Sequence, residues 1–355
     1  MRQSLPLNRI GIPTLLACAT LLRVAAQFEH AVIAQDSVTP VPRLLIAYGS
    51  YKDRTKYPTV TFYEHDGHAD GKIVGTIPPV DLRSDSHPSL SHDGKFCAFT
   101  SELENQTSRI LLWDRVAKQL VDLPGVNDSP NSQQHAALSR SGNVLAFAAW
   151  NRPGSSNRWD VLTFDVSSKT IPGRGTTGPL APSLSPWNTA TNDERMPALS
   201  ADGNLLALVT NSPEGEGLTD IVLWDRANRR AVPLPNLNSP HREGEPSLSA
   251  DGRWIAFVSD RPGGEGARDV YLYDRQTSQL VPLPGLNSVA HEQMPAISPD
   301  GRLMTFVSER RAGAGERDIF LYDRTTSGLL PTPQLNSPRE EIDPCIILLP
   351  TLSGG

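Results

Sequence analysis

Acidic residues recur at one position of a repeated segment and could together bind a cation or a basic peptide. Each lies three residues before a proline, or before the alanine that replaces it in one copy, and the last four are 49 residues apart. The six residues at this position are Asp85, Gln133, Glu194, Glu243, Glu292 and Glu341. Carboxylate oxygens are hard ligands of the kind that Ca²⁺ prefers. If the segments surround one axis, we expect these residues to form an acidic collar that attracts cations.

The same acids have a structural alternative. Each could pair with an arginine at the end of a strand in a neighbouring repeat, such as Arg261 or Arg310, or accept hydrogen bonds from loop N–H groups. Crowded carboxylates raise one another's pKa unless a cation or an arginine neutralises them. The sequence leaves the binding role and the structural role open.

Histidines form the second candidate constellation. His87 and His135 each lie directly before the proline position in successive repeats, and His241 and His291 lie in corresponding connecting segments. Imidazole nitrogens beside carboxylates could hold a transition metal or activate a water. This indicates an alternative function, a metal-dependent lyase or hydrolase acting on a polysaccharide or a small substrate. Solvated loop histidines are the simpler interpretation, because none has the spacing of a helical metal motif.

These candidate residues lie in repeats that must be built from short β-strands. The segments ending at Gly203, Gly252 and Gly301 share a Pro-x-Leu/Ile-Ser core and an Asp-Gly pair, and their glycines are 49 residues apart. Copies ending at Gly94 and Gly142 precede them. The Asp-Gly pair suits a hairpin turn, and apolar segments of four to six residues are too short for helices. About four strands in each repeat of this length are typical of a β-propeller blade.

Five complete repeats and two terminal fragments give six blades. Segments 44–48, 60–64 and 72–76 match the second, third and fourth strands of a blade, and 343–348 matches the missing first strand. We therefore predict an all-β, six-bladed propeller over residues 43–349, with four antiparallel strands per blade and a short tail after it. The last blade is closed by strands from both ends of the chain, which removes exposed sheet edges.

The repeat pattern resembles a known family. Residues 246–261 read Pro-Ser-Leu-Ser-Ala-Asp-Gly-Arg-Trp-Ile-Ala-Phe-Val-Ser-Asp-Arg, and 269–275 read Asp-Val-Tyr-Leu-Tyr-Asp-Arg. Both segments are similar to the TolB-like β-propeller repeat family, and the resemblance covers nearly all of the chain after residue 43. It implies an exported, non-catalytic propeller that binds protein partners in the cell envelope. We expect the separate α/β domain of TolB to be missing, because fewer than ten residues separate the expected cleavage site from the first strand.

The N-terminal residues predict export. Basic residues precede a twelve-residue apolar run, 11–22, and small residues up to Ala34 offer a cleavage site. This is the pattern of a signal peptide over residues 1–34, whereas a membrane span needs about 20 apolar residues. Cys18 offers a lipoprotein signal as an alternative, and whether it carries lipid stays open. We expect a periplasmic or secreted protein with no transmembrane span.

Composition narrows the class of partner. The chain has 355 residues, 33 Lys and Arg against 39 Asp and Glu, and a formal net charge of −6. A nucleic-acid partner needs a basic surface, so it is excluded. The three cysteines exclude a disulfide-rich scaffold. We predict a non-catalytic monomer that binds a protein or peptide through the face carrying the acidic collar and the Gly-rich loops 262–266 and 312–316.

Overall fold

The computed structural model describes most of the chain after the expected signal peptide. The described residues are 40–51, 57–67, 70–78, 84–103, 107–126, 129–150, 157–169 and 185–350. The predicted signal peptide, Cys18 and residues 351–355 lie outside these ranges. Regular secondary structure within them consists of β-strands, and no helix there is long and apolar enough to cross a membrane.

One blade shows how the repeat folds. The fifth blade contains β15 (Glu243–Leu248), β16 (Trp254–Ser259), β17 (Asp269–Asp274) and β18 (Gln279–Val281), paired antiparallel in that order. The turn from β15 to β16 contains Gly252 with φ +65°, a conformation that favours glycine. Nearly all of β16 is buried, because a blade packs against a neighbouring blade on each of its faces.

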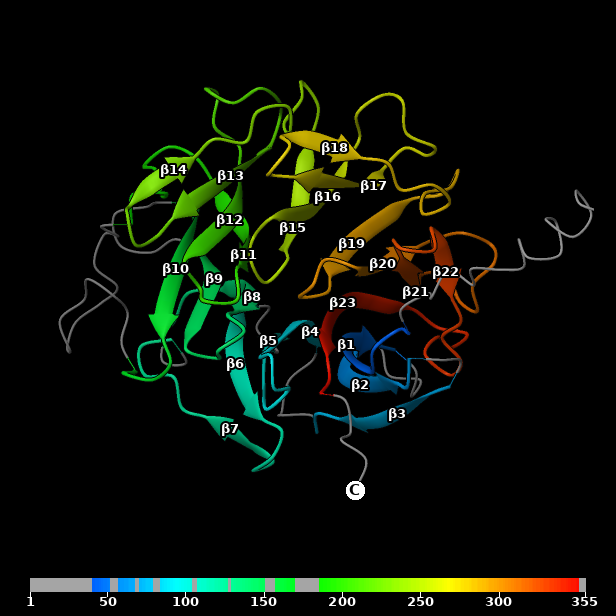
Figure 1. Cartoon of the computed structure of the whole chain (residues 1–355). Coiled ribbons are helices and arrows are strands. Elements are labelled where there is room, and N and C mark those ends of the chain that lie inside the picture. Colours follow the sequence, from blue (N-terminus) through cyan, green and yellow to red (C-terminus); the bar gives the residue numbers. More distant parts are fainter. Residues whose placement is uncertain are drawn as a thin grey trace, which may run out of the picture. The chain divides into compact units, whose positions relative to one another are not determined.

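The other blades repeat this arrangement around a central axis (Figure 1). The second blade contains β4 (Ser84–Leu90), β5 (Phe96–Glu102), β6 (Ser108–Asp114) and β7 (Gln119–Val121). The third contains β8 (Gln133–Leu138), β9 (Val144–Trp150) and β10 (Trp159–Asp165). The fourth contains β11 (Glu194–Leu199), β12 (Leu205–Thr210), β13 (Asp220–Asp225) and β14 (Arg230–Val232). The sixth contains β19 (Glu292–Ile297), β20 (Leu303–Ser308), β21 (Asp318–Asp323) and β22 (Gly328–Leu330).

The first blade joins the two ends of the propeller. It consists of β1 (Leu44–Ser50), β2 (Thr59–His65) and β3 (Gly71–Thr76), with β23 (Glu341–Leu348) as its innermost strand. β23 pairs antiparallel with β1, and Leu44 lies opposite Leu348. The predicted six-bladed propeller and its closure by strands from both ends are confirmed.

The third blade shows three strands rather than four in the described residues. The predicted fourth strand would follow β10 and falls in 170–184, outside the described ranges.

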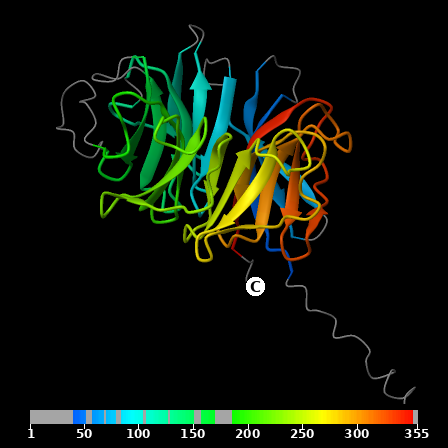
Figure 2. The ribbon, with the colours of Figure 1, turned by 90° about the horizontal axis from the view of Figure 1, so that it is seen from above.

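The hydrophobic core lies between adjacent blades. One cluster joins Val209 and Leu223 of the fourth blade to Ile255 and Phe257 of the fifth. Tyr273, near the end of the fifth blade's third strand, belongs to this cluster, and its hydroxyl donates to the Pro235 carbonyl oxygen at 2.8 Å. The packed blades therefore hold six innermost strands around one central axis, and the strands run between the two faces of the propeller (Figure 2).

Strand direction defines two faces of the propeller. The innermost strands begin at the face that carries the connections from the second to the third strand and from the fourth strand to the next blade; we call it the loop face. They end at the face that carries the Asp-Gly turns, which we call the turn face.

Candidate functional site

Each innermost strand contains a β-bulge directly before its proline position. The ladder to the next strand shifts register there in all six blades. At the bulge one residue has a left-handed backbone, with φ between 50° and 56°. These residues, called the bulge ring below, are His87, His135, Met196, Glu245, Met294 and Asp343. A bulge re-aims the side chain that it carries, and here it turns all six toward the central channel.

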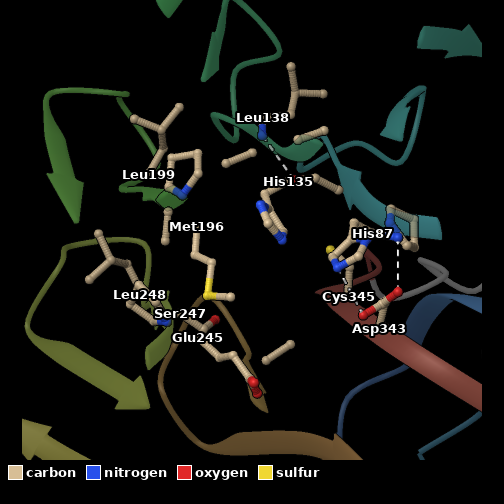
Figure 3. Close-up of a pocket in the computed structure, with 18 of the residues that line it drawn as sticks. His87, His135, Leu138, Met196, Leu199, Glu245, Ser247, Leu248, Asp343 and Cys345 are labelled. Carbon is tan, nitrogen blue, oxygen red and sulfur yellow. Dashed lines mark hydrogen bonds and ion pairs between the residues drawn. The ribbon is translucent and has the colours of Figure 1, made fainter. Parts of the chain in front are cut away.

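The bulge ring lines a central cavity of about 270 Å³, built by the innermost strands of all six blades (Figure 3). Below the ring, prolines and aliphatic side chains form apolar walls. Leu138, Leu199, Leu248, Ile297 and Ile346 are among them. The cavity is slightly smaller than the usual range of about 300–1,000 Å³ for small-ligand pockets.

Side chains of the bulge ring accept hydrogen bonds from three of the backbone N–H groups at the bulges. Glu245 Oε2 accepts from the Met294 N–H at 2.5 Å, and Met294 Sδ accepts from the Asp343 N–H at 3.4 Å. Asp343 Oδ2 accepts from the His87 N–H at 3.2 Å. Each of these bonds crosses to the following blade, so together they join the fifth, sixth, first and second blades at the channel.

The two histidines of the metal hypothesis meet in this ring. The imidazoles of His87 and His135 lie edge to face with centroids 4.7 Å apart, and His87 Nε2 is 3.4 Å from Asp343 Oδ1. Burial, with smaller effects of His87 and Arg195, lowers the pKa of His135 well below its usual value. His135 Nδ1 is enclosed and has no hydrogen-bond partner among the described residues. Across those residues, no three His, Cys, Asp or Glu side chains have an arrangement that could hold a metal ion.

The residues of the predicted acidic collar lie elsewhere. All six are buried, and in the described part of the chain the bulge ring lines the central cavity in their place. Glu243 Oε1 accepts from Ser239 and Ser259 hydroxyls at 2.6 and 2.9 Å, and pairs with Arg261 at 2.8 Å. The arginine belongs to the same blade, not to a neighbouring blade as we expected. The side chain of Glu243 therefore joins strands of its own blade, and cation binding by the collar stays a prediction.

The remaining collar residues follow this pattern in part. Glu292 pairs with Arg310 at 3.0 Å, Asp85 accepts from the Ser101 hydroxyl, and Gln133 donates to the Val126 carbonyl oxygen at 2.8 Å. Glu194 and Glu341 have no ion-pair partner within the described ranges, and burial raises the pKa of each to about 7. The repeat thus places two protonatable carboxyls at the position where Glu243 and Glu292 form ion pairs.

A second cavity of about 490 Å³ opens at the loop face between the fourth and fifth blades. Its lining carries charges of both signs and includes Arg195, Arg242 and Arg268. Arg268 Nη2 is 2.8 Å from Glu245 Oε1 of the bulge ring. Met196 and Glu245 border both this cavity and the central one. Arg268 recurs one repeat later as Arg317, whereas Arg195 and Arg242 are replaced there by Gly244 and His291, so the sequence offered no common repeat signal for the three arginines.

The Gly-rich loops that we expected at the same face have a structural anchor. Asp269, the first residue of β17, accepts from the N–H groups of Glu265 and Gly266, both at 3.1 Å. A side chain at Gly264 would collide with the Asp269 carboxylate, since its Cβ would lie 2.0 Å from a carboxylate oxygen. The glycines therefore let each loop wrap around a buried aspartate.

Comparison with known proteins agrees with this architecture. No known family profile matches the chain, and no curated protein matches its sequence. TolB from Acinetobacter baumannii is similar in structure, with a TM-score of 0.56 and 17% identity over 95% of this chain and 74% of that one. A putative TolB from Agrobacterium tumefaciens has a TM-score of 0.50 and 16% identity over 88% and 99% of the two chains.

An enzyme shares the same architecture. An oligogalacturonate lyase in complex with manganese has a TM-score of 0.50 and 11% identity over 80% of this chain and 77% of that chain. The protein is therefore a six-bladed β-propeller, and the predicted resemblance to TolB-like propellers is confirmed at the level of the fold. Structural similarity at such low sequence identity shows the fold alone, so the activity has to be inferred from the residues of the site.

Proposed function

We propose that this protein is a binding propeller whose loop face takes an extended segment of a protein partner. The observation that carries the proposal is the pair of cavities at that face, which share Met196 and Glu245 as lining residues. A peptide lying in the cavity between the fourth and fifth blades would reach the central cavity without leaving the surface. The likeness to TolB propellers supports a protein partner.

The chemistry of the loop face suits a protein interface. Leu218 and Val289 lie in its connections, with 62% and 89% of their surface exposed. Thr219, the residue after Leu218, lines the second cavity, which also carries Arg242, Arg268 and Asp260. Protein interfaces combine a few apolar and arginine anchors with a polar rim, and the anchors supply most of the binding energy.

We also propose that the protein is exported, with residues 1–34 as its signal peptide. The support is the sequence pattern of that segment and the likeness of the fold to TolB. Mass spectrometry of the native protein tests the proposal. A mature chain beginning near Gln35, or a lipid on Cys18, is expected, and an intact segment 1–34 on envelope protein would contradict export.

Site-specific photocrosslinking tests the proposed binding face. A crosslinker in place of Arg242, whose side chain is 65% exposed at the loop face, is expected to capture a discrete partner in cells. The matched control replaces Lys118, an exposed residue at the turn face. Capture at both positions, or at the Lys118 position alone, would reject the loop face as the binding surface.

The second candidate function is a metal-dependent lyase or hydrolase. It is favoured by the meeting of His87, His135 and Asp343 at the channel and by the likeness to a manganese-bound lyase. Elemental analysis of the purified protein separates the two functions. A stoichiometric transition metal that is lost in His87→Ala and His135→Ala would favour the enzyme.

A further inference from the structure

The central cavity is lined by a positively charged side chain at the end opposite the bulge ring. Arg140 lines the cavity just after β8, where the innermost strand ends at the turn face. The other complete repeats have an imidazole or a small side chain at this position: His92, Ala201, Ala250 and Pro299. The arginine is therefore a feature of this one blade and not part of the repeat that builds the fold.

The guanidinium of Arg140 has no ion-pair or hydrogen-bond partner in the ranges that the structure describes, and its Nη1 is fully enclosed. Burial lowers the pKa of Arg140, and the smaller electrostatic effects of Cys345 and Asp300 act against this. Asp300 Oδ1 is already engaged, since it accepts from the Ser298 hydroxyl at 2.5 Å and the Arg302 N–H at 3.0 Å. Arg140 is half-buried, and an enclosed guanidinium N–H group without a partner is costly, so this end of the cavity favours an anion.

The rest of the cavity defines what that anion must be attached to. Apolar walls of proline, leucine and isoleucine lie between Arg140 and the bulge ring. The carboxylates of Glu245 and Asp343 lie at the ring end, so a ligand with a second negative charge there would be repelled. The cavity thus fits a group with one terminal anion and an apolar body that extends toward the loop face.

We propose that the central cavity binds the C-terminal carboxylate of a peptide, with Arg140 as its anchor. This rests on the proposed function, because the peptide is the end of the segment that enters from the loop face. A guanidinium binds a carboxylate through two parallel N–H···O bonds, and such charge-assisted bonds are stronger than neutral ones. Apolar side chains of the last residues would then pack against the channel walls.

Calorimetric titration of the full chain with three probes tests this site. Acetyl-Ala-Leu as the free acid is expected to bind at least about tenfold more tightly than its C-terminal amide, the usual minimum effect of a charge-assisted bond. Arg140→Gln is expected to abolish this preference, and Arg140→Lys to retain part of it. Arg230→Gln removes the same charge from an exposed position on β14 and is expected to change nothing. Thermal melts of each variant verify folding.

Each other outcome overturns the proposal. Equal binding of acid and amide, no heat with either, or a preference that survives Arg140→Gln would remove Arg140 as a carboxylate anchor. Octanoate, the third probe, separates a free fatty acid from a peptide end; if it alone shows Arg140-dependent binding, the ligand is not a peptide. If the crosslinker at Arg242 captures a partner but the free acid binds no better than the amide, only the role of Arg140 as carboxylate anchor is rejected. If the free acid binds better but the crosslinker captures nothing, the protein partner of the proposed function is rejected.

Discussion

Glu243 Oε1 lies 2.8 Å from Arg261 Nη2 inside one blade, and this ion pair also reaches the blade before it. Arg261 Nη2 donates to the Leu237 carbonyl oxygen at 2.6 Å, in the segment that connects the fourth blade to the fifth. The guanidinium also lies over the rings of Phe257 and Tyr271. Glu243 is therefore linked through Arg261 to the connection from the preceding blade, although the arginine itself belongs to its own blade.

Glu243→Gln is predicted to lower the free energy of unfolding by about 3–5 kcal/mol at pH 7, because it leaves the largely buried Arg261 without its counter-charge. Urea unfolding measures this, and Glu292→Gln should behave alike through Arg310. Calorimetric titration with Ca²⁺ tests the alternative, that the acidic collar binds a cation. Saturable Ca²⁺ binding that Glu243→Gln weakens without loss of stability would support the acidic collar as a cation site.

Glu194 should make stability depend on pH. Burial raises its pKa to about 7 in the folded protein, above the ordinary 4.5. The contribution of Glu194 to the free energy of unfolding is fully present below pH 4.5, where the carboxyl is protonated in both the folded and the unfolded state. This contribution is lost as the pH rises to about 7, because the folded state then has to ionise a buried carboxyl. Glu194→Gln is therefore expected to stabilise the protein at pH 8 by about 1–3 kcal/mol, a range reduced for solvent screening.

The control for this pH effect is the matched residue of another blade. Glu243→Gln should destabilise at pH 8, where Glu194→Gln stabilises, because only Glu243 has an arginine partner. Urea unfolding at pH 4 and pH 8 gives both comparisons. A Glu194→Gln protein with the same pH dependence as the wild type would show that Glu194 is ionised in the folded state at neutral pH.

Deletion of residues 343–355 is predicted to unfold or oligomerise the protein. It removes most of β23, including Ile346 and Ile347, which are buried against β1 and the neighbouring blades. Burial of these two side chains contributes about 3–6 kcal/mol, against about 5–15 kcal/mol for a whole domain. Thermal melting and size-exclusion chromatography measure the result. A truncated chain that stays monomeric with an unchanged melting temperature would contradict the role of β23 in closure.

Leu218→Ser is predicted to weaken capture of the partner at the Arg242 position at least about fivefold, because it removes an exposed apolar anchor at the loop face. Stability should change by less than about 0.5 kcal/mol, since Leu218 is 62% exposed. Val116→Ser is the matched control, an equally apolar residue that is 76% exposed at the turn face. If both substitutions weaken capture alike, the effect does not come from the proposed surface.

The blade architecture could be predicted from the sequence because its signals are local. The Asp-Gly pairs specify hairpin turns, and short apolar segments between them specify strands, so each 49-residue repeat carries the information for its own blade. The vacant first strand of the first blade, matched by 343–348, predicted the ring closure that β23 and β1 form. Among the predicted blade strands, only the fourth strand of the third blade falls outside the described residues.

The channel lining was decided by the tertiary structure. A regular strand places residues two apart on one face, so a repeated acid such as Glu243 gives no sign of which neighbour faces the channel. The bulge with φ 54° at Glu245 breaks that alternation and turns this side chain inward. Such a backbone persists because contacts from the next blade stabilise it, here the bond from Met294 N–H to Glu245. The sequence alone determined the six blades and their closure, whereas contacts between blades decided which residues the channel presents.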